Sequence, residues 1–330
     1  SDTKPGDFAE QSRRDPRRER ARVHAGLFVM RAAVSLTPVM QNRYAGLDMT
    51  DEAKTTSHRD HPDLRHVTGP FDIIGDVHGC ADELQELLHK LGYEARLYGT
   101  GDGRRAHVKS PSGRRAVFVG DLVDRGPAAP DVLRLVLALV AEGHALCVPG
   151  NHDVKFVRWL AGRNVKLTHG LDKTAEQFEA ESPAFRTHIG SFLEKLPIHV
   201  WLDGGKLAVA HAGLKEDMLG RDTDKIRSFC LYGETSGEQD EFGLPVRYHW
   251  AAEYRGSTAV IYGHTPVPDP GWVNNTLCVD TGCCFGGKLS ALRWPEREIV
   301  SVPARKVHAE SRRPFGHPPV RPGVGATGSG

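Results

Sequence analysis

Short apolar runs that end in glycine-containing polar turns recur along the chain between residues 71 and 280. Runs of three to five apolar residues bounded by turn signals are typical of buried strands. Residues 93–115, which contain Gly-Asp-Gly and Ser-Gly turn signals, are expected to form a hairpin before the central strand. Strands are expected at 71–74, 116–119, 145–148, 198–202, 207–210, 260–262 and, as the last of them, 277–279.

Segments with helical spacing separate several of these runs. Four leucines recur at intervals of three and four after the first strand, at positions 84, 87, 88 and 91, which predicts a helix there. Residues 132–140 have the spacing of a buried helix. Residues 156–160 and 178–196 are also expected to be helical, with Pro183 and Pro197 as breaks. Alternating strands and helices indicate an α/β fold.

Polar residues of metal-ligand or acid/base type follow six of the expected strands. In α/β sheets the carboxyl ends of the strands converge on one crevice, where ligands bind. Any one of the 17 histidines is ordinarily a surface residue or a satisfied core residue. Polar residues of this type at the ends of six strands, however, predict a single site. The residues concerned are Asp76, His78, Asp121, Asn151, His152, His211, His264 and Asp280.

The turn at residues 120–126, Gly-Asp-Leu-Val-Asp-Arg-Gly, is the centre of this pattern. Two divalent cations about 3.5–4 Å apart repel each other and need a shared anionic ligand. Asp121 can offer one carboxylate oxygen to each cation. His152 can donate a proton to a leaving group, with Asp124 as the partner that orients it. Considered alone, this turn is equally compatible with an ordinary polar connection between a strand and a helix.

Composition limits the class of protein. The chain has 330 residues and a mass of 36.2 kDa, and 39% hydrophobic with 26% charged residues is ordinary for a soluble enzyme. A net charge of +1 predicts no strong non-specific attraction to nucleic acid. Six cysteines without a Cys-x-x-Cys pair favour reduced thiols and a cytoplasmic location. No apolar stretch reaches the ~18–20 residues of a membrane span, so no membrane partner is expected.

Three regions are expected along the chain. Residues 1–66, rich in arginine at the start, are expected to be an N-terminal extension that is partly disordered or helical. Residues 67–303 would form the catalytic domain, and the Pro/Gly-rich residues 304–330 a disordered tail. Residues 215–256 mix basic and aromatic side chains, which fits a packed flap and a nucleotide-binding surface equally well. Arg247 and Arg255 are the candidate phosphate ligands in that segment.

The ordered motifs resemble those of the calcineurin-like metallophosphoesterases, in the form of the phosphoprotein phosphatase branch. They are Gly-Asp-Val-His-Gly, Gly-Asp-Leu-Val-Asp-Arg-Gly, Gly-Asn-His-Asp, His-Ala-Gly and Gly-His-Thr-Pro. Residues 69–80, 165–171 and 279–289 further resemble the central phosphatase module of bacterial polynucleotide kinase-phosphatases, which belong to RNA end-healing systems.

The resemblance implies two mixed β-sheets packed as a sandwich flanked by helices, with a binuclear metal centre. Asp76, His78 and Asp121 would bind one divalent ion; Asp121, Asn151, His211 and His264 would bind the other. Manganese is the expected metal, with iron, zinc or nickel as alternatives. His152 would protonate the leaving oxygen with Asp124 as its partner, and Arg125 would bind phosphoryl oxygens. Asp280 would lie close to the site.

The expected activity is metal-dependent phosphoester hydrolysis by in-line attack of a water activated by two metals. The narrower motifs favour RNA 2′,3′ ends or nucleotides as substrates. A serine/threonine protein phosphatase, with a phosphoprotein substrate, or a diadenosine tetraphosphatase is the alternative. A binding module with a degenerate site is a further alternative, disfavoured because every expected ligand is present. Kinase and ligase motifs of the larger repair proteins are absent.

Overall fold

The computed structural model describes residues 59–313 and the backbone of residues 320–321. All of these described residues belong to one compact unit. The expected N-terminal extension falls outside the described residues up to position 58, and so does the expected tail at 314–319 and 322–330. None of the described helices combines the length and the apolar character that crossing a bilayer requires.

The first sheet has five strands in the order β14-β13-β1-β4-β5. β1, β4 and β5 run parallel, whereas β13 pairs antiparallel with both β1 and β14. The sheet is therefore mixed, as expected. Its strands are β1 (Phe71–Ile74), β4 (Arg115–Phe118), β5 (Ala145–Cys147), β13 (Lys288–Trp294) and β14 (Glu298–Pro303).

The second sheet is also mixed, with the order β11-β12-β10-β7-β6. β7, β10 and β12 run parallel, and the edge strands β6 and β11 are antiparallel to their neighbours. Its strands are β6 (His199–Leu202), β7 (Leu207–Ala210), β10 (Ala259–Tyr262), β11 (Trp272–Val273) and β12 (Thr276–Cys278).

An apolar layer joins the two sheets face to face. Ile73 and Val117 of the first sheet share one buried cluster with Val209 and Ile261 of the second. Because successive side chains on a strand point to opposite faces, the neighbouring Ile74 belongs to a different cluster, beneath the helices. The strands are thus buried on both faces, which explains why their sequences are continuous apolar runs.

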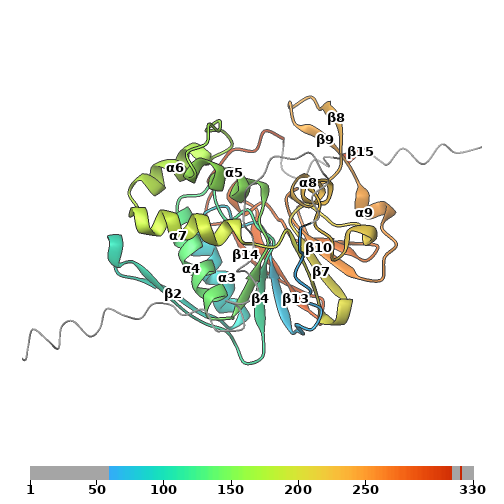
Figure 1. The fold of residues 1–330 in the computed structure, drawn as a ribbon, viewed down its shortest axis with the longest axis horizontal. Coiled ribbons are helices and arrows are strands. Elements are labelled where there is room, and N and C mark those ends of the chain that lie inside the picture. The colour runs from blue at the N-terminus through green and yellow to red at the C-terminus, as the bar shows by residue number, and fades with distance from the viewer. Residues whose placement is uncertain (1–58, 314–319, 322–330) are drawn as a thin grey trace, which may run out of the picture. The chain divides into compact units, whose positions relative to one another are not determined.

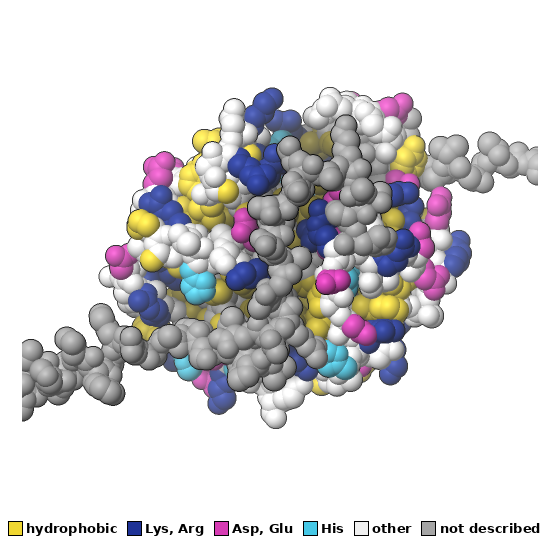
Figure 2. Space-filling model, in the orientation of Figure 1, with side chains coloured by type: hydrophobic (Ala, Val, Ile, Leu, Met, Phe, Trp, Pro, Cys, Tyr) yellow, Lys and Arg dark blue, Asp and Glu magenta, His cyan; other side chains and the backbone are white. Residues whose placement is uncertain are grey.

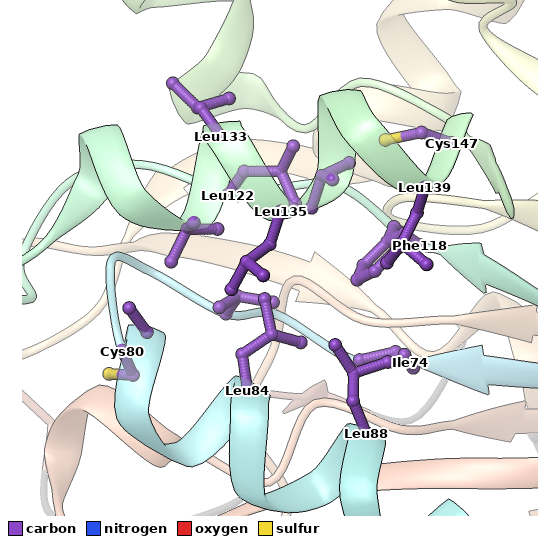
Figure 3. Packing of buried hydrophobic residues seen from close by; sticks show 14 of the residues in the cluster. Ile74, Cys80, Leu84, Leu88, Phe118, Leu122, Leu133, Leu135, Leu139 and Cys147 are labelled. Carbon is purple, nitrogen blue, oxygen red and sulfur yellow. The ribbon is translucent and has the colours of Figure 1, made fainter. Parts of the chain in front are cut away.

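Helices cover the outer face of each sheet (Figure 1). On the first sheet, leucines of α3 and α4 meet over the strands, and Figure 3 shows Leu84 and Leu88 directed toward Leu135. On the second sheet, Phe229 and Trp250 pack with residues of β7 and β10. The helices are α3 (Ala81–Leu91), α4 (Ala129–Ala141), α5 (Asn151–Leu160), α6 (Leu171–Glu179), α7 (Pro183–Glu194), α8 (Asp224–Tyr232) and α9 (Trp250–Glu253).

Two smaller sheets complete the described structure. The hairpin expected within residues 93–115 is confirmed as β2 (Glu94–Tyr98) paired with β3 (Arg105–Lys109). A three-stranded sheet contains β8 (Thr235–Gln239), β9 (Pro245–Tyr248) and β15 (Val320–Arg321). Short 3₁₀ helices lie at Gly101–Gly103, Asp203–Gly205, Glu216–Met218 and Cys283–Phe285.

Two expectations about elements are wrong. Residues 277–279 do not hold the last strand, because β13 and β14 follow and complete the first sheet. Ser290 interrupts the apolar run of β13, yet it is buried because its hydroxyl bonds to those of Thr281 and Ser301 at 2.7 and 2.8 Å. The helical segment expected at 178–196 has the expected break at Pro183, where α7 begins, but its first helix, α6, begins earlier than expected, at Leu171.

Described residues on both sides of the expected catalytic domain contact it. Leu64 is buried in the layer between the sheets, and His61 stacks on His199 with ring centroids 3.9 Å apart. After β14, the His308 ring lies 3.2 Å from a carboxylate oxygen of Glu83 on α3. The packed structure therefore extends beyond residues 67–303 at both ends.

Candidate active site

The parallel strands of both sheets bring the predicted site residues together. Asp76 and His78 follow β1, Asp121 follows β4, and Asn151 begins α5 directly after β5. In the second sheet, His211 and His264 follow β7 and β10. Because each set of three strands is parallel, its carboxyl ends meet at one edge of the sheet.

Glycines make room for the carboxylates. A Cβ atom on Gly150 would lie 2.0 Å from Oδ1 of Asp121, and one on Gly263 would lie 2.0 Å from Oδ1 of Asp76. Both distances are far below contact, so only glycine fits where these turns cross the acidic side chains. The glycine in each motif is therefore part of the site.

Asp121, the predicted bridging ligand, lies between two histidines of the site. Its Oδ2 lies 3.4 Å from Nε2 of His78, and its Oδ1 lies 3.4 Å from Nε2 of His211. Nε2 of His211 also lies 3.1 Å from Oδ1 of Asn151 and 3.0 Å from Nδ1 of His264. The two oxygens of one carboxylate thus face two separate groups of ligand atoms.

The protonation of the imidazoles fits cations at both positions. Nδ1 of His78 and Nδ1 of His211 face the carbonyl oxygens of Val123 and Val119 at 2.8 and 3.0 Å. Donation from Nδ1 leaves Nε2 of each ring as a lone pair directed at Asp121. Nε2 of His264 is buried and has no hydrogen-bond partner among the described residues. These lone pairs are satisfied if metal ions lie between them.

Burial favours the neutral form of the ionisable groups of the site. Desolvation raises the pKa of Asp121 and of Asp280 to about 7, and desolvation together with the charges of Asp280 and Asp121 raises the pKa of Asp76 well above its ordinary value. Desolvation also lowers the pKa of His211 to about 3, so its imidazole is neutral. Crowded carboxylates and neutral imidazoles form a site that cations would stabilise.

His152 lies against Asp124 as expected. Nδ1 of His152 is 2.5 Å from Oδ2 of Asp124, and the other carboxylate oxygen accepts a hydrogen bond from Thr174 at 2.8 Å. Burial raises the pKa of Asp124 to about 8, whereas burial and the charge of Arg125 lower the pKa of His152. The pair is oriented for proton transfer, but the structure does not favour an imidazolium in the free site.

Arg125 reaches across both histidines. Its Nη1 donates to Nε2 of His78, and its Nη2 lies 3.0 Å from Nε2 of His152. The guanidinium packs over the Phe285 ring at 5.0 Å, and Gly170 approaches the Arg125 backbone so closely that a Cβ there would lie 2.3 Å from its nitrogen. The motifs at 165–171 and 279–289 thus position this arginine.

Comparison with known proteins identifies the family. A model of calcineurin-like phosphoesterases matches residues 69–268. This chain belongs to that family. It is 46% identical over 250 residues to a bis(5′-nucleosyl)-tetraphosphatase PrpE [asymmetrical] from Anoxybacillus flavithermus, covering 74% of this chain and 99% of the relative. It is 45% identical over 240 residues to a protein of the same name from Halalkalibacterium halodurans, covering 72% and 94%.

A solved structure supports the metallophosphoesterase fold. A protein serine/threonine phosphatase from Saccharomyces cerevisiae superposes with a TM-score of 0.51 at 14% identity, covering 75% of this chain and 84% of that one. At this identity the likeness concerns the fold alone. The chain is therefore a hydrolase with the metallophosphoesterase fold. Divalent cations, if held by the His and Asp side chains of the site, would supply Lewis acidity and charge neutralisation for attack of water on phosphorus.

The three expected substrate ligands of this metallophosphoesterase differ in placement. Asp280 lies in the metal site, where its charge acts on Asp76. Arg247 is close enough for its positive charge to lower the pKa of His211 and His264. The structure does not bring Arg255 to the site, because its Nη1 donates to the carbonyls of Ala252 and Tyr254.

Two residues of the site were missed in the sequence. Asp153 is buried and accepts hydrogen bonds at 2.9 Å from the backbone nitrogens of Leu122 and Gly150, which ties the two metal-binding turns together. Its place in the Gly-Asn-His-Asp motif, at the third residue of a helix, is a signal that could have identified it. Thr174 carries no such signal, because it lies in a helix whose start was not recognised.

Proposed function

We propose that this metallophosphoesterase hydrolyses dinucleoside tetraphosphates asymmetrically. Water would add to a terminal phosphorus of the tetraphosphate, and the bond to the next bridging oxygen would break, giving a nucleoside monophosphate and a nucleoside triphosphate. The observation that carries the proposal is 46% identity across 99% of a relative named for this activity. The diadenosine tetraphosphatase alternative of the sequence analysis thus has more support than the RNA-end reading.

The charges around the site support a polyphosphate substrate. Arg125 contacts His78 and His152, the charge of Arg247 acts on His211, and Lys155 lies on α5, the helix that carries His152. Among the described residues, the side chains of Arg125, Arg247, Lys155 and Lys173 donate to carbonyl, hydroxyl or imidazole acceptors and form no ion pair with a carboxylate. These cations remain available to phosphate oxygens.

A broad nucleic-acid surface has less support. On the face that Figure 2 shows, the visible Lys and Arg side chains of the described residues are interspersed with Asp and Glu. The motifs that favoured RNA ends, at 165–171 and 279–289, contact Arg125 and so serve phosphate chemistry common to many substrates. Basic side chains confined to the site favour a compact polyanion over an extended nucleic-acid strand.

In this proposal the site residues divide into three groups. Asp76 and His78 would hold one metal, Asn151, His211 and His264 the other, and Asp121 both. Arg125 would bind the nonbridging oxygens of the attacked phosphate. His152, oriented by Asp124, would supply a proton to the leaving phosphate oxygen.

The activity can be tested with the purified chain and MnCl₂. Diadenosine tetraphosphate should give equal amounts of AMP and ATP, separated by ion-exchange chromatography. Its kcat/KM should exceed those for an RNA 3′-phosphate, an RNA 2′,3′-cyclic phosphate and a phosphoserine peptide. Asp121→Ala, checked for folding by circular dichroism, is the matched inactive control. ADP as the sole product, or preference for an RNA end or the peptide, would overturn the proposal.

A further inference from the structure

A pocket opens beside His264, on the side of the second sheet. It has a volume of about 100 Å³ and lies between the end of α8, the start of α9 and the turns after β10. Its walls include Tyr232, Arg247, Tyr248, Trp250, Tyr262 and His264. The pocket therefore adjoins His264 and contains three of the six Phe, Tyr and Trp side chains of the 215–256 segment.

The aromatic residues of this segment divide into a floor and a rim. Trp250 is buried and packs on Tyr262 and Phe229 with ring centroids 5.0 and 5.9 Å apart. Tyr254 is likewise buried and donates its hydroxyl to the Thr258 carbonyl at 2.8 Å. Tyr232, by contrast, is 45% exposed. The buried rings of the floor support the fold, whereas the exposed ring of Tyr232 at the rim is accessible to a ligand.

Arg247 lies between the rim and the metal site. Its Nη1 donates to the Tyr232 carbonyl, and its charge acts on both His211 and His264. Desolvation lowers its pKa to about 10, with a contribution from the charge of Arg313. A half-buried guanidinium with no carboxylate partner among the described residues favours an anionic ligand.

These positions require a ligand with a phosphate at one end and a flat, largely apolar ring a short distance away. On the basis of the proposed function, we propose that the open mouth of this pocket binds one base of the substrate against Tyr232 and Tyr248, with the adjoining phosphate on Arg247. Tyrosine rings bind bases through their π faces without requiring a particular base. The pocket then selects nucleotide phosphates over phosphate esters that lack a base.

Calorimetry with AMP and with inorganic phosphate, each in MnCl₂, tests the pocket independently of turnover. The wild-type chain should bind AMP more tightly than phosphate, and Tyr232→Ala and Tyr248→Ala should each weaken AMP binding by about tenfold without changing phosphate binding. Tyr232→Phe should retain AMP affinity, because the ring face is kept. Tyr98→Ala, which removes an exposed tyrosine of the β2–β3 hairpin, should change neither.

The possible outcomes distinguish a failure of the pocket proposal from a failure of the proposed function. If diadenosine tetraphosphate is cleaved to AMP and ATP but neither tyrosine variant changes AMP affinity or KM, the pocket proposal fails and the function stands. If the tyrosine variants weaken AMP binding but the wild type does not cleave the tetraphosphate, the pocket stands and the function fails. Equal affinity for AMP and phenyl phosphate would overturn the pocket proposal, because a plain ring would then suffice.

Discussion

The turns after the parallel strands and the 215–256 segment contribute to the same site in different ways. Asp121 and His211 are 2% and 0% exposed and are held by both sheets, whereas Tyr232 is 45% exposed and lies at the end of a surface helix. The 215–256 segment is an insertion between the strands that carry His211 and His264. The geometry of the sheets therefore determines the reaction. Changes in the 215–256 segment can alter the choice of substrate while the metal ligands stay in place.

The largest effect should come from Asp121, the residue most firmly held by the sheets. Asp121→Ala removes the carboxylate that faces both ligand groups, so activity should fall by on the order of 10³-fold or more on every substrate. Stabilisation by manganese, measured as the shift in melting temperature, should be lost as well. Retained activity on any substrate in the panel would contradict the metal-bridging role.

His152 tests whether the chemistry depends on the leaving group. His152→Asn should reduce turnover of phenyl phosphate by about 10²–10³-fold, because its phenolate leaving group needs a proton. Turnover of p-nitrophenyl phosphate, which has the same shape and a weakly basic leaving group, should fall much less. Asp124→Asn should reproduce this pattern through loss of orientation. Equal losses on the two esters would contradict proton donation by this pair.

Without metal, the free energy of unfolding should depend on pH through the buried carboxylates. Burial raises the pKa of Asp121 and Asp280 to about 7 and that of Asp124 to about 8. Their stabilising contribution is therefore complete below pH 4 and is lost as the pH rises through 7 to 8, while neutral histidines already contribute fully above pH 6.5. In EDTA, the free energy of unfolding should fall between pH 6.5 and 8.5. The slope is about 1.4 kcal/mol per pH unit for each proton that the folded state still binds and the unfolded state has released.

Excess manganese should remove this fall, because the ligands bind metal in their deprotonated forms. Urea unfolding at each pH, with EDTA or with MnCl₂, measures both curves. A metal-free protein that becomes more stable over this range would contradict the assigned shifts.

The smallest effect is expected at Arg255, within the segment but away from the pocket. Arg255→Ala should change kcat/KM for diadenosine tetraphosphate by less than about twofold, because its guanidinium bonds to local carbonyls. Arg247→Ala, matched in residue type, should raise KM by about tenfold. Similar effects of the two substitutions would mean that the segment acts as one charged surface.

The sequence predicts the catalytic turns better than their surroundings for physical reasons. Asp76, Asp121 and His264 each follow a strand buried on both faces. Such strands are continuous apolar runs in the sequence, so the first polar residue marks where the strand ends. β13 was missed because its buried Ser290 is satisfied by hydroxyl groups 9 and 11 positions away, outside the strand, which no hydrophobic pattern reveals.

Arg247 and Arg255 illustrate the same limit within the candidate site. Both are arginines in one aromatic-basic segment, eight positions apart, and local sequence does not distinguish them. Arg247 is placed beside His264 by the pairing of β9 with β8, whereas Arg255 follows a short helix and folds back on its own carbonyls. Only the tertiary arrangement distinguishes an arginine beside the site from one that bonds to nearby carbonyls.

The backbone of the site carries a cost of its own. Among the described residues, nine other than glycine have a positive φ, and five of them are His78, Asp121, Asp124, Arg125 and His264. This conformation costs about 1–2 kcal/mol per residue relative to glycine. Selection for heat resistance alone would therefore favour glycine at these positions and would erode the catalytic turns before the core. Their persistence in a lineage would record selection for activity acting against stability.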